Sequence, residues 1–399
     1  MNLRTLLGYF FGSRQAIEAI AYAPKAVWLG ALFVLSAGFA REYDGVDLLQ
    51  EPGHVFVPLG VSLPTSFLLF CLLMPALRPQ RSAAAGFWRA YWSFLGLYWM
   101  TAPLAWLYAI PVERFLSPLG AMQANLWLLA VVSAWRVLLM IRVVSVLFAV
   151  RLLHSFCVVM FFADSVAVVA LTVTECSLVS LMSGARLSDS EALLRQTTEL
   201  ACWFSLVTWP LWFLLCLGAA MSAGWLKRKP RLLELPRGKV SWSLWALAAF
   251  SLVIWAFILP ITQAEQRRAS EARIMVRRGP LVEAMRWMSQ HEPGDFPPSW
   301  EPPPRPQAEE RQPGVLAIVE SLIEADAAPW VRELYLDKIE RVLQLNQSHF
   351  EVTEDLKRVG YERFVQLLEQ MPEGREFMKR NEEQMRLLKM HLDSLKRDP

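Results

Sequence analysis

A long stretch of almost uninterrupted apolar sequence runs from Leu126 to Met182. As one α-helix it would be about 85 Å long, whereas the hydrocarbon core of a bilayer is about 30 Å thick. The stretch therefore has to turn back on itself. Arg136, Arg142 and Arg151 interrupt it. We expect the turn between Arg142 and His154, with residues 143–150 lying along the membrane surface and Arg142 and Arg151 snorkelling to the headgroups.

Segments of about 20 mostly apolar residues predict membrane-spanning helices. The sequence predicts seven of them, namely Pro24–Ala40, Phe56–Leu77, Arg89–Ile110, Asn125–Ile141, Leu153–Val173, Leu200–Trp225 and Ser241–Thr262. The composition agrees, because a chain of 399 residues that is 54% hydrophobic and 19% charged is too apolar for an ordinary soluble protein. The predicted fold class is all-α, a polytopic transmembrane helical bundle of about seven spans with a small C-terminal soluble helical domain.

The charged residues divide the chain into two regions. Residues 1–263 contain 19 Lys and Arg against 12 Asp and Glu, whereas residues 264–399 contain 21 against 25. The predicted domains are an interfacial amphipathic N-terminal helix (1–22), a transmembrane domain (23–263), a charged juxtamembrane helix (264–292), a proline-rich linker (293–314) and a soluble helical domain (315–399).

The N-terminal segment has apolar residues at helical spacing, which favours a helix in the membrane interface. A cleaved signal peptide ending at Gly38–Ala40 is the alternative, because small residues precede a polar stretch there. The segment is long and mixed, whereas a signal peptide has a short basic start. We therefore expect the interfacial helix.

Lys and Arg near the span ends predict the orientation. Fourteen of them fall on the side of the membrane where the N-terminus lies. The other side has four, namely Arg41, Arg114, Arg186 and Arg195. This predicts a cytoplasmic N-terminus and, with seven spans, an extracytoplasmic C-terminal domain; an even number of spans would reverse the second prediction. The 31 Arg against 9 Lys indicate a GC-rich genome and hence a bacterial inner membrane.

Eight prolines in residues 293–314 predict an extended, semi-rigid spacer. Its PPPRP motif is alternatively a polyproline ligand for an aromatic groove. From Val315 onward apolar residues return at helical spacing in four stripes, and Pro329 and Pro372 sit where helices begin. Such short helices form only a small core, so we expect residues 315–399 to bind a protein partner or to self-associate.

Two charges inside predicted spans form the main candidate site. Arg136 and Asp164 lie at similar depths on the two arms of the predicted hairpin. An unpaired carboxylate in the bilayer would cost several kcal/mol or become protonated, so we expect the two to pair. The pair would either fix helix packing or serve as a substrate or proton site.

Four further polar residues are secondary candidates: Arg142, Arg151, His154 and Glu175. Their positions near span ends also suit contact with headgroups. The arginines at 136, 142 and 151 are separated by 6 and 9 residues, so they form no single helical stripe, which excludes a voltage-sensing helix.

We find no catalytic motif and no cluster with metal-ligand spacing. The five cysteines lack CxxC spacing and lie in apolar segments, as buried small hydrophobes do. We therefore predict no catalytic residue, no metal, no cofactor and no nucleic-acid partner. The expected function is a non-enzymatic membrane anchor or scaffold that displays a helical interaction domain; the alternative is a transporter or channel with an Arg/Asp polar site, and an enzyme comes third.

Overall fold

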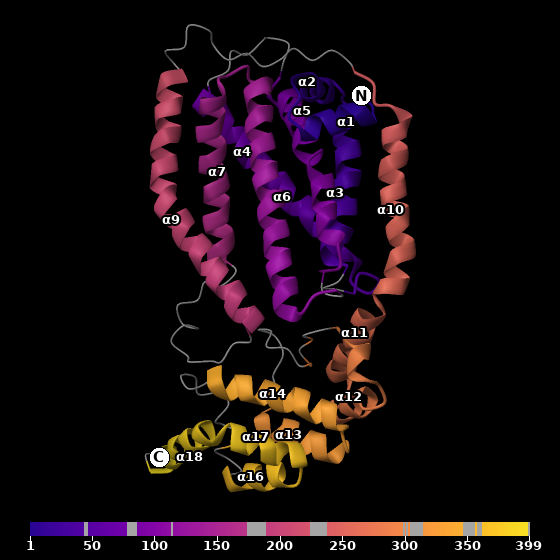
Figure 1. Ribbon diagram of the computed structural model, residues 1–399, viewed down its shortest axis with the longest axis vertical. Coiled ribbons are helices and arrows are strands. Elements are labelled where there is room, and N and C mark those ends of the chain that lie inside the picture. The colour runs from indigo at the N-terminus through magenta and orange to yellow at the C-terminus, as the bar shows by residue number, and fades with distance from the viewer. Residues whose placement is uncertain are drawn as a thin grey trace. The chain divides into compact units, whose positions relative to one another are not determined.

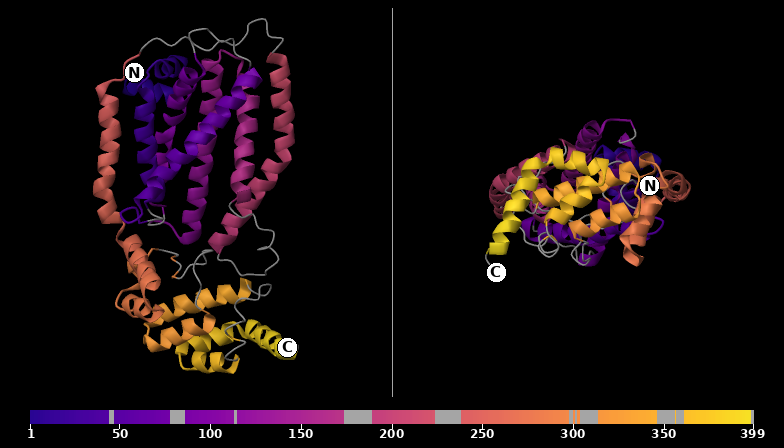
Figure 2. Two further views of the ribbon diagram at one scale, coloured as in Figure 1. Left: turned by 180° about the vertical axis from the view of Figure 1, so that it is seen from behind. Right: turned by 90° about the horizontal axis from the view of Figure 1, so that it is seen from below.

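The computed structural model describes residues 1–43, 47–77, 86–112, 115–173, 189–223, 238–297, 300, 302–303, 314–345, 356 and 361–397. Every regular element within these ranges is a helix (Figure 1, with two further views in Figure 2), which confirms the all-α class. The described residues form two compact units, one ending at Gln263 and the other beginning at Ala264. We call them the membrane unit and the C-terminal unit.

The helices of the membrane unit account for most of the predicted spans. Five of them, α4 with η1 before it, α6, α7, α9 and α10, are long and apolar enough to cross a membrane, and the bent pair α2 and α3 makes a sixth if it is taken as one span. The described elements are α1 (Leu3–Phe10), α2 (Arg14–Ala21), α3 (Ala26–Glu42), η1 (Pro52–Phe56), α4 (Val57–Leu77), α5 (Phe87–Trp99), η2 (Ala102–Ala109), α6 (Pro118–Leu147), α7 (Leu152–Val173), α9 (Asp189–Ala223) and α10 (Trp242–Thr262).

The N-terminal residues form two short helices, α1 and α2, instead of one. Gly12 lies between them with a φ of +69°, a conformation that residues with a Cβ rarely adopt. Tyr9 of α1 is fully buried in the core of the unit, and its hydroxyl donates to the carbonyl oxygen of Leu97 in α5 over 2.6 Å. The N-terminal helices are therefore packed onto the bundle, and only one face of α1 remains exposed.

The predicted span Arg89–Ile110 is a broken helix. The α-helix α5 ends at Trp99, and the 3-10 helix η2 begins at Ala102 with Pro103 as its second residue. A proline in a helix interior removes a backbone donor and clashes with the preceding turn, so the break follows from the sequence. Neither piece is long enough to count as a spanning helix by itself.

The turn between α6 and α7 differs from the prediction. Residues 143–150 do not lie along a surface, because α6 continues to Leu147 and its last turn is buried in the core. The helix ends where Ala149 adopts a φ of +53° and the N–H of Val150 donates to the carbonyl oxygen of Ser145 over 3.1 Å. Packing of this apolar turn against the bundle stabilises the continued helix.

The C-terminal unit has one hydrophobic core to which each of its α-helices contributes. Pro329 and Pro372 are the first residues of α14 and α17, as predicted, while the last predicted stripe divides at Asn381 into two helices. The described elements are α11 (Ala264–Arg278), α12 (Leu281–Met288), η4 (Pro293–Asp295), α13 (Val315–Glu324), α14 (Pro329–Leu345), α16 (Tyr361–Glu369), α17 (Pro372–Arg380) and α18 (Glu382–Arg397).

Part of the proline-rich segment belongs to this core. Phe296 and Trp300 stack with ring centroids 4.7 Å apart, and both are buried. The Tyr335 hydroxyl of α14 donates to the carbonyl oxygen of Pro303 over 2.7 Å, and Nζ of Lys338, one turn later, donates to that of Pro302 over 2.8 Å. These described residues do not behave as a free spacer; residues 304–313 lie outside the described ranges.

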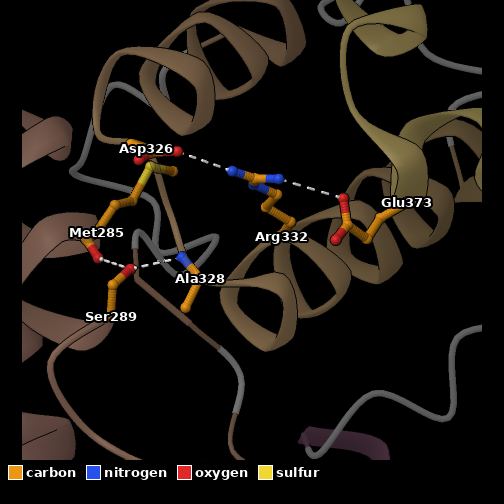
Figure 3. Close-up of polar contacts among 6 residues, drawn as sticks. All are labelled: Met285, Ser289, Asp326, Ala328, Arg332 and Glu373. Atoms are coloured by element: carbon orange, nitrogen blue, oxygen red, sulfur yellow. Dashed lines mark hydrogen bonds and ion pairs between the residues drawn. The ribbon is translucent and has the colours of Figure 1, made fainter.

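Polar side chains join the helices of this unit at their ends (Figure 3). The hydroxyl of Ser289 donates to the Met285 carbonyl over 2.8 Å and accepts from the N–H of Ala328 over 2.9 Å. The guanidinium of Arg332 lies between Asp326, at 3.1 Å, and Glu373, at 3.5 Å. The start of α14 is thus tied both to α12 and to α17.

Candidate functional site

The predicted pair of Arg136 and Asp164 is not formed. No ion pair joins the two residues in the part of the chain that the structure describes. Nε of Arg136 donates to Oγ1 of Thr101 over 3.3 Å, whereas Oδ2 of Asp164 accepts from Oγ1 of Thr208 over 3.0 Å. The reason is that Asp164 faces α9 from α7, and Arg136 faces the break between α5 and η2 from α6.

The Asp164 contact is one of several polar contacts along the antiparallel pair α7 and α9. Asp164 is 8% exposed, so its carboxylate depends on the hydroxyl that Thr208 supplies. In the next register Nε1 of Trp209 donates to Oγ of Ser165 over 3.0 Å. These contacts link two helices that are otherwise apolar, as interhelical hydrogen bonds do in membrane bundles.

His154 lies at the other end of the same pair of helices. Its Nε2 is 3.1 Å from Oγ of Ser222, and its Nδ1 is buried with no hydrogen-bond partner. Its described polar contact therefore also joins α7 to α9. Glu175, another predicted candidate, lies outside the described residues.

The two remaining arginines differ in what they contact. Nε of Arg142 donates to the carbonyl oxygen of Gly12 over 3.2 Å, directly after the end of α1. Nε1 of Trp135, two turns earlier on α6, donates to the carbonyl oxygen of Phe10 over 2.8 Å. A cation and an indole N–H thus satisfy carbonyl groups at a helix C-terminus. Arg151 is exposed and makes no side-chain bond to any described residue.

The break between α5 and η2 lies next to Arg136, and the sequence did not predict that the two are close together. Thr101 in the break is 1% exposed, and its hydroxyl donates to the Tyr98 carbonyl over 2.7 Å while it accepts from Arg136. Burial raises the pKa of the Tyr9 phenol, and the nearby charge of Arg136 opposes that rise. Within the described residues, Arg136 has no carboxylate partner. Pro103 was the available signal for this break.

The described residues contain no group of three His, Cys, Asp or Glu side chains placed to hold a metal ion. The site is therefore a set of single contacts between helices, with Arg136 as the charged member that lacks a counter-charge among the described residues. No protein-family model, no curated protein and no solved structure is significantly similar to this chain.

Proposed function

We propose that the protein is a multi-pass membrane anchor that presents a folded helical unit, residues 264–399, to a protein partner. The observation that carries this proposal is the Asp164–Thr208 hydrogen bond. Asp164 is the most buried charged residue among the described residues of the spanning helices, and its hydrogen bond joins α7 to α9, which suits a packing role. The C-terminal unit, in turn, has a core of its own and is rich in surface charge.

Seven passes through the membrane are part of this proposal. The support is the run of contacts between α3 and the broken helix α5–η2. Early in α3, Val27 and Gly30 lie against Gly96 and Trp99 of the broken helix. Further along, Nε1 of Trp106 donates to Oγ of Ser36. Directly after the end of α3, the hydroxyl of Tyr43 donates to the carbonyl oxygen of Ala109. The broken helix thus runs parallel to α3 from Gly96 to Ala109, and we count it as a full pass.

An odd number of passes separates the two ends of the chain. With basic residues favouring the cytoplasmic side, the N-terminal helices would lie in the cytoplasm and the C-terminal unit outside it. The composition of the chain favours a bacterial inner membrane as the location.

The partner surface that we propose is on α18. Leu387 and Met390 of this helix are 40% and 61% exposed, and among the described residues of the C-terminal unit they are the large hydrophobic side chains most open to solvent. Exposed apolar side chains on a charged helix are typical of protein contact sites. The partner can be a different protein or a second copy of this chain.

A photo-crosslinking amino acid at Leu387 or Met390 of the full chain in cells tests this proposal. We expect an adduct of one defined mass, and a probe at exposed Gln366 of α16 serves as the control. Equal adducts at Leu387 and Gln366, or none at either position of α18, would contradict a partner surface on α18.

The alternative function is a transporter or channel, and Arg136 is the observation that favours it. An arginine that faces a broken helix without a carboxylate partner among the described residues resembles the polar sites of transporters, where broken helices bind ions. The path would then involve Arg136 and the α5–η2 break.

Substitutions at Asp164 and Thr208 distinguish the two functions. If Asp164 serves packing, Asp164→Asn retains an acceptor for Thr208, so the amount of folded protein should stay near normal. Thr208→Val leaves the buried carboxylate without its donor and should lower the free energy of unfolding by about 1–3 kcal/mol. Both can be measured by thermal unfolding in detergent. Loss of ion flux into vesicles with Arg136→Gln or Asp164→Asn, at normal stability, would instead support transport.

A further inference from the structure

We propose that a groove at the corner between α2 and α3 binds the phosphate group of an anionic phospholipid. The groove lies within the membrane unit and is lined on one side by the α2–α3 turn and on the other by one face of α5. Its lining includes Tyr22, Trp28, Arg89, Trp92, Ser93 and Gly96.

The sharp bend between α2 and α3 creates the groove. The two helices meet at 105°, and Pro24 lies in the turn between them. At the inner end α3 approaches α5 closely, since a Cβ on Gly96 would lie 3.4 Å from Val27. Towards the corner the two walls leave space between them, and the indoles of Trp28 and Trp92 flank it.

The groove is positively charged. Arg89 is exposed, and its guanidinium has no hydrogen bond or ion pair with any described residue. No Asp or Glu is among the described residues that line the groove, and Glu18, one turn before Tyr22, is paired with Arg14 over 2.8 Å. Arg89 also lies in the first turn of α5, where no side chain caps the helix, so the backbone N–H groups add partial positive charge.

Further positive charge comes from the chain around the groove. Lys25 follows Pro24 in the turn and is exposed. The carbonyl oxygen of Tyr22 accepts from the N–H of Gly238 over 2.7 Å, which brings the backbone next to Lys239 to the edge of the groove. An anion with one or two charges is the ligand that complements this arrangement.

The exposed side chains of Trp28 and Trp92 favour a lipid over a soluble anion as the ligand. Their side chains are 66% and 48% exposed, and tryptophan at such positions favours the headgroup level of a bilayer. A phosphodiester would accept from the guanidinium of Arg89, and the acyl chains would lie against the indoles. A soluble phosphate would use Arg89 but gain nothing from exposed indoles.

Lipid binding to the purified full chain in detergent tests the proposal, with phosphatidylglycerol and phosphatidylcholine as probes in native mass spectrometry. We expect preferential binding of phosphatidylglycerol. Arg89→Gln should weaken it about tenfold, because the variant removes the charged donor of the hydrogen bonds to the phosphodiester. Arg151→Gln removes the same charge from an exposed position outside the groove and should leave binding unchanged.

Ser93→Phe provides a second variant that fills the groove and keeps every charge. It should also weaken binding of phosphatidylglycerol, and thermal unfolding establishes that each variant is folded. Equal effects of Arg89→Gln and Arg151→Gln, equal binding of the two lipids, or displacement of the lipid by millimolar inorganic phosphate would each overturn the proposal; the last result would assign the groove to a soluble anion.

Discussion

The membrane unit and the C-terminal unit each bury one tyrosine completely, but they surround it with different chemistry. Tyr9 donates to the Leu97 carbonyl and Tyr335 donates to the Pro303 carbonyl. Near Tyr9 the described polar contacts are single bonds between helices, and Arg136 is the charge close to it. Near Tyr335, one turn along α14, the buried ammonium of Lys338 is bound as well.

The same contrast extends over both units. In the membrane unit, the charged side chains of Asp164 and Arg136 contact hydroxyl groups, those of Thr208 and Thr101. In the C-terminal unit, opposite charges pair between helices, as Arg380 does with Asp337 at 2.7 Å and Glu340 at 2.9 Å. Water can solvate the unused sides of an ion pair, whereas lipid cannot, so an ion pair between helices costs less desolvation at the surface of the C-terminal unit than it would inside a bilayer.

The largest loss of stability is expected when Gly30, which lets α3 pack closely against α5, is replaced by a larger residue. A Cβ on Gly30 would lie 2.7 Å from Cβ of Trp99, so Gly30→Val should force α3 from α5 and cost about 3 kcal/mol. Gly60 of α4 has nothing within 4 Å of its added Cβ, and Gly60→Val is the matched control with little expected loss. Thermal unfolding followed by a thiol-reactive dye reports the membrane unit, because all five cysteines lie before residue 264. Similar losses for both variants would refute this packing role.

Removal of the two buried hydroxyls compares the units directly. Tyr335→Phe should cost about 1–2 kcal/mol, since it leaves the Pro303 carbonyl without its donor. Tyr9→Phe should cost a similar amount in the membrane unit. Hydrogen exchange of α14 measures the first variant and the thiol-reactive dye the second. Tyr361→Phe on α16, whose side chain is partly exposed, is the control for Tyr335; an equal loss there would contradict the assignment.

Alkaline pH should weaken the C-terminal unit through Tyr335. Burial raises the pKa of this phenol, so the folded unit keeps it neutral while the unfolded chain ionises above about pH 10. Stability is then complete below that pH and falls by about 1 kcal/mol between about pH 10 and about pH 11. Urea denaturation of the wild-type and Tyr335→Phe chains over this range isolates the effect as their difference. A difference that stays constant with pH would rule it out.

The smallest effect is expected at the residue with positive φ that follows one helix in each unit. Ala149 after α6 and Asp326 after α13 both have positive φ, at 53° and 46°. Glycine adopts this conformation without strain, so Ala149→Gly should stabilise by about 1 kcal/mol. Asp326→Gly should gain less, because aspartate tolerates the conformation better and also pairs with Arg332. Thermal unfolding measures the stability gained by Ala149→Gly, and hydrogen exchange measures that gained by Asp326→Gly. Equal gains in the two variants would show that the ion pair of Asp326 with Arg332 does not contribute to stability.

The sequence was sufficient for the helical class, for five long apolar helices and for the helix starts at Pro329 and Pro372. These features depend on local apolar spacing and on proline, which act within a few residues. The partners of Arg136 and Asp164 were not predictable, because depth along two helices does not determine which neighbour each side chain faces. Thr208 and Thr101 could not be singled out either, since a lone threonine in an apolar helix has no distinguishing pattern.

The described part of the proline-rich segment and the α6–α7 turn differ from the prediction for a related reason. The sequence indicates that prolines exclude helix, but it does not indicate that Tyr335 and Lys338 would bind their carbonyl groups. Likewise, arginines flank residues 143–150, but burial of that helical turn depends on the surrounding bundle. In both cases long-range packing decided the outcome.

The count of membrane passes is the central claim, and it depends on α5–η2 crossing beside α3. Single cysteines at exposed Ser13 and at exposed Gln366, in a chain without its native cysteines, can be labelled in intact cells with a membrane-impermeant thiol reagent. Seven passes predict that the cysteine at 366 reacts and the cysteine at 13 does so only after lysis. Equal labelling of the two positions in intact cells would contradict the odd number of passes and return the C-terminal unit to the side of the N-terminus.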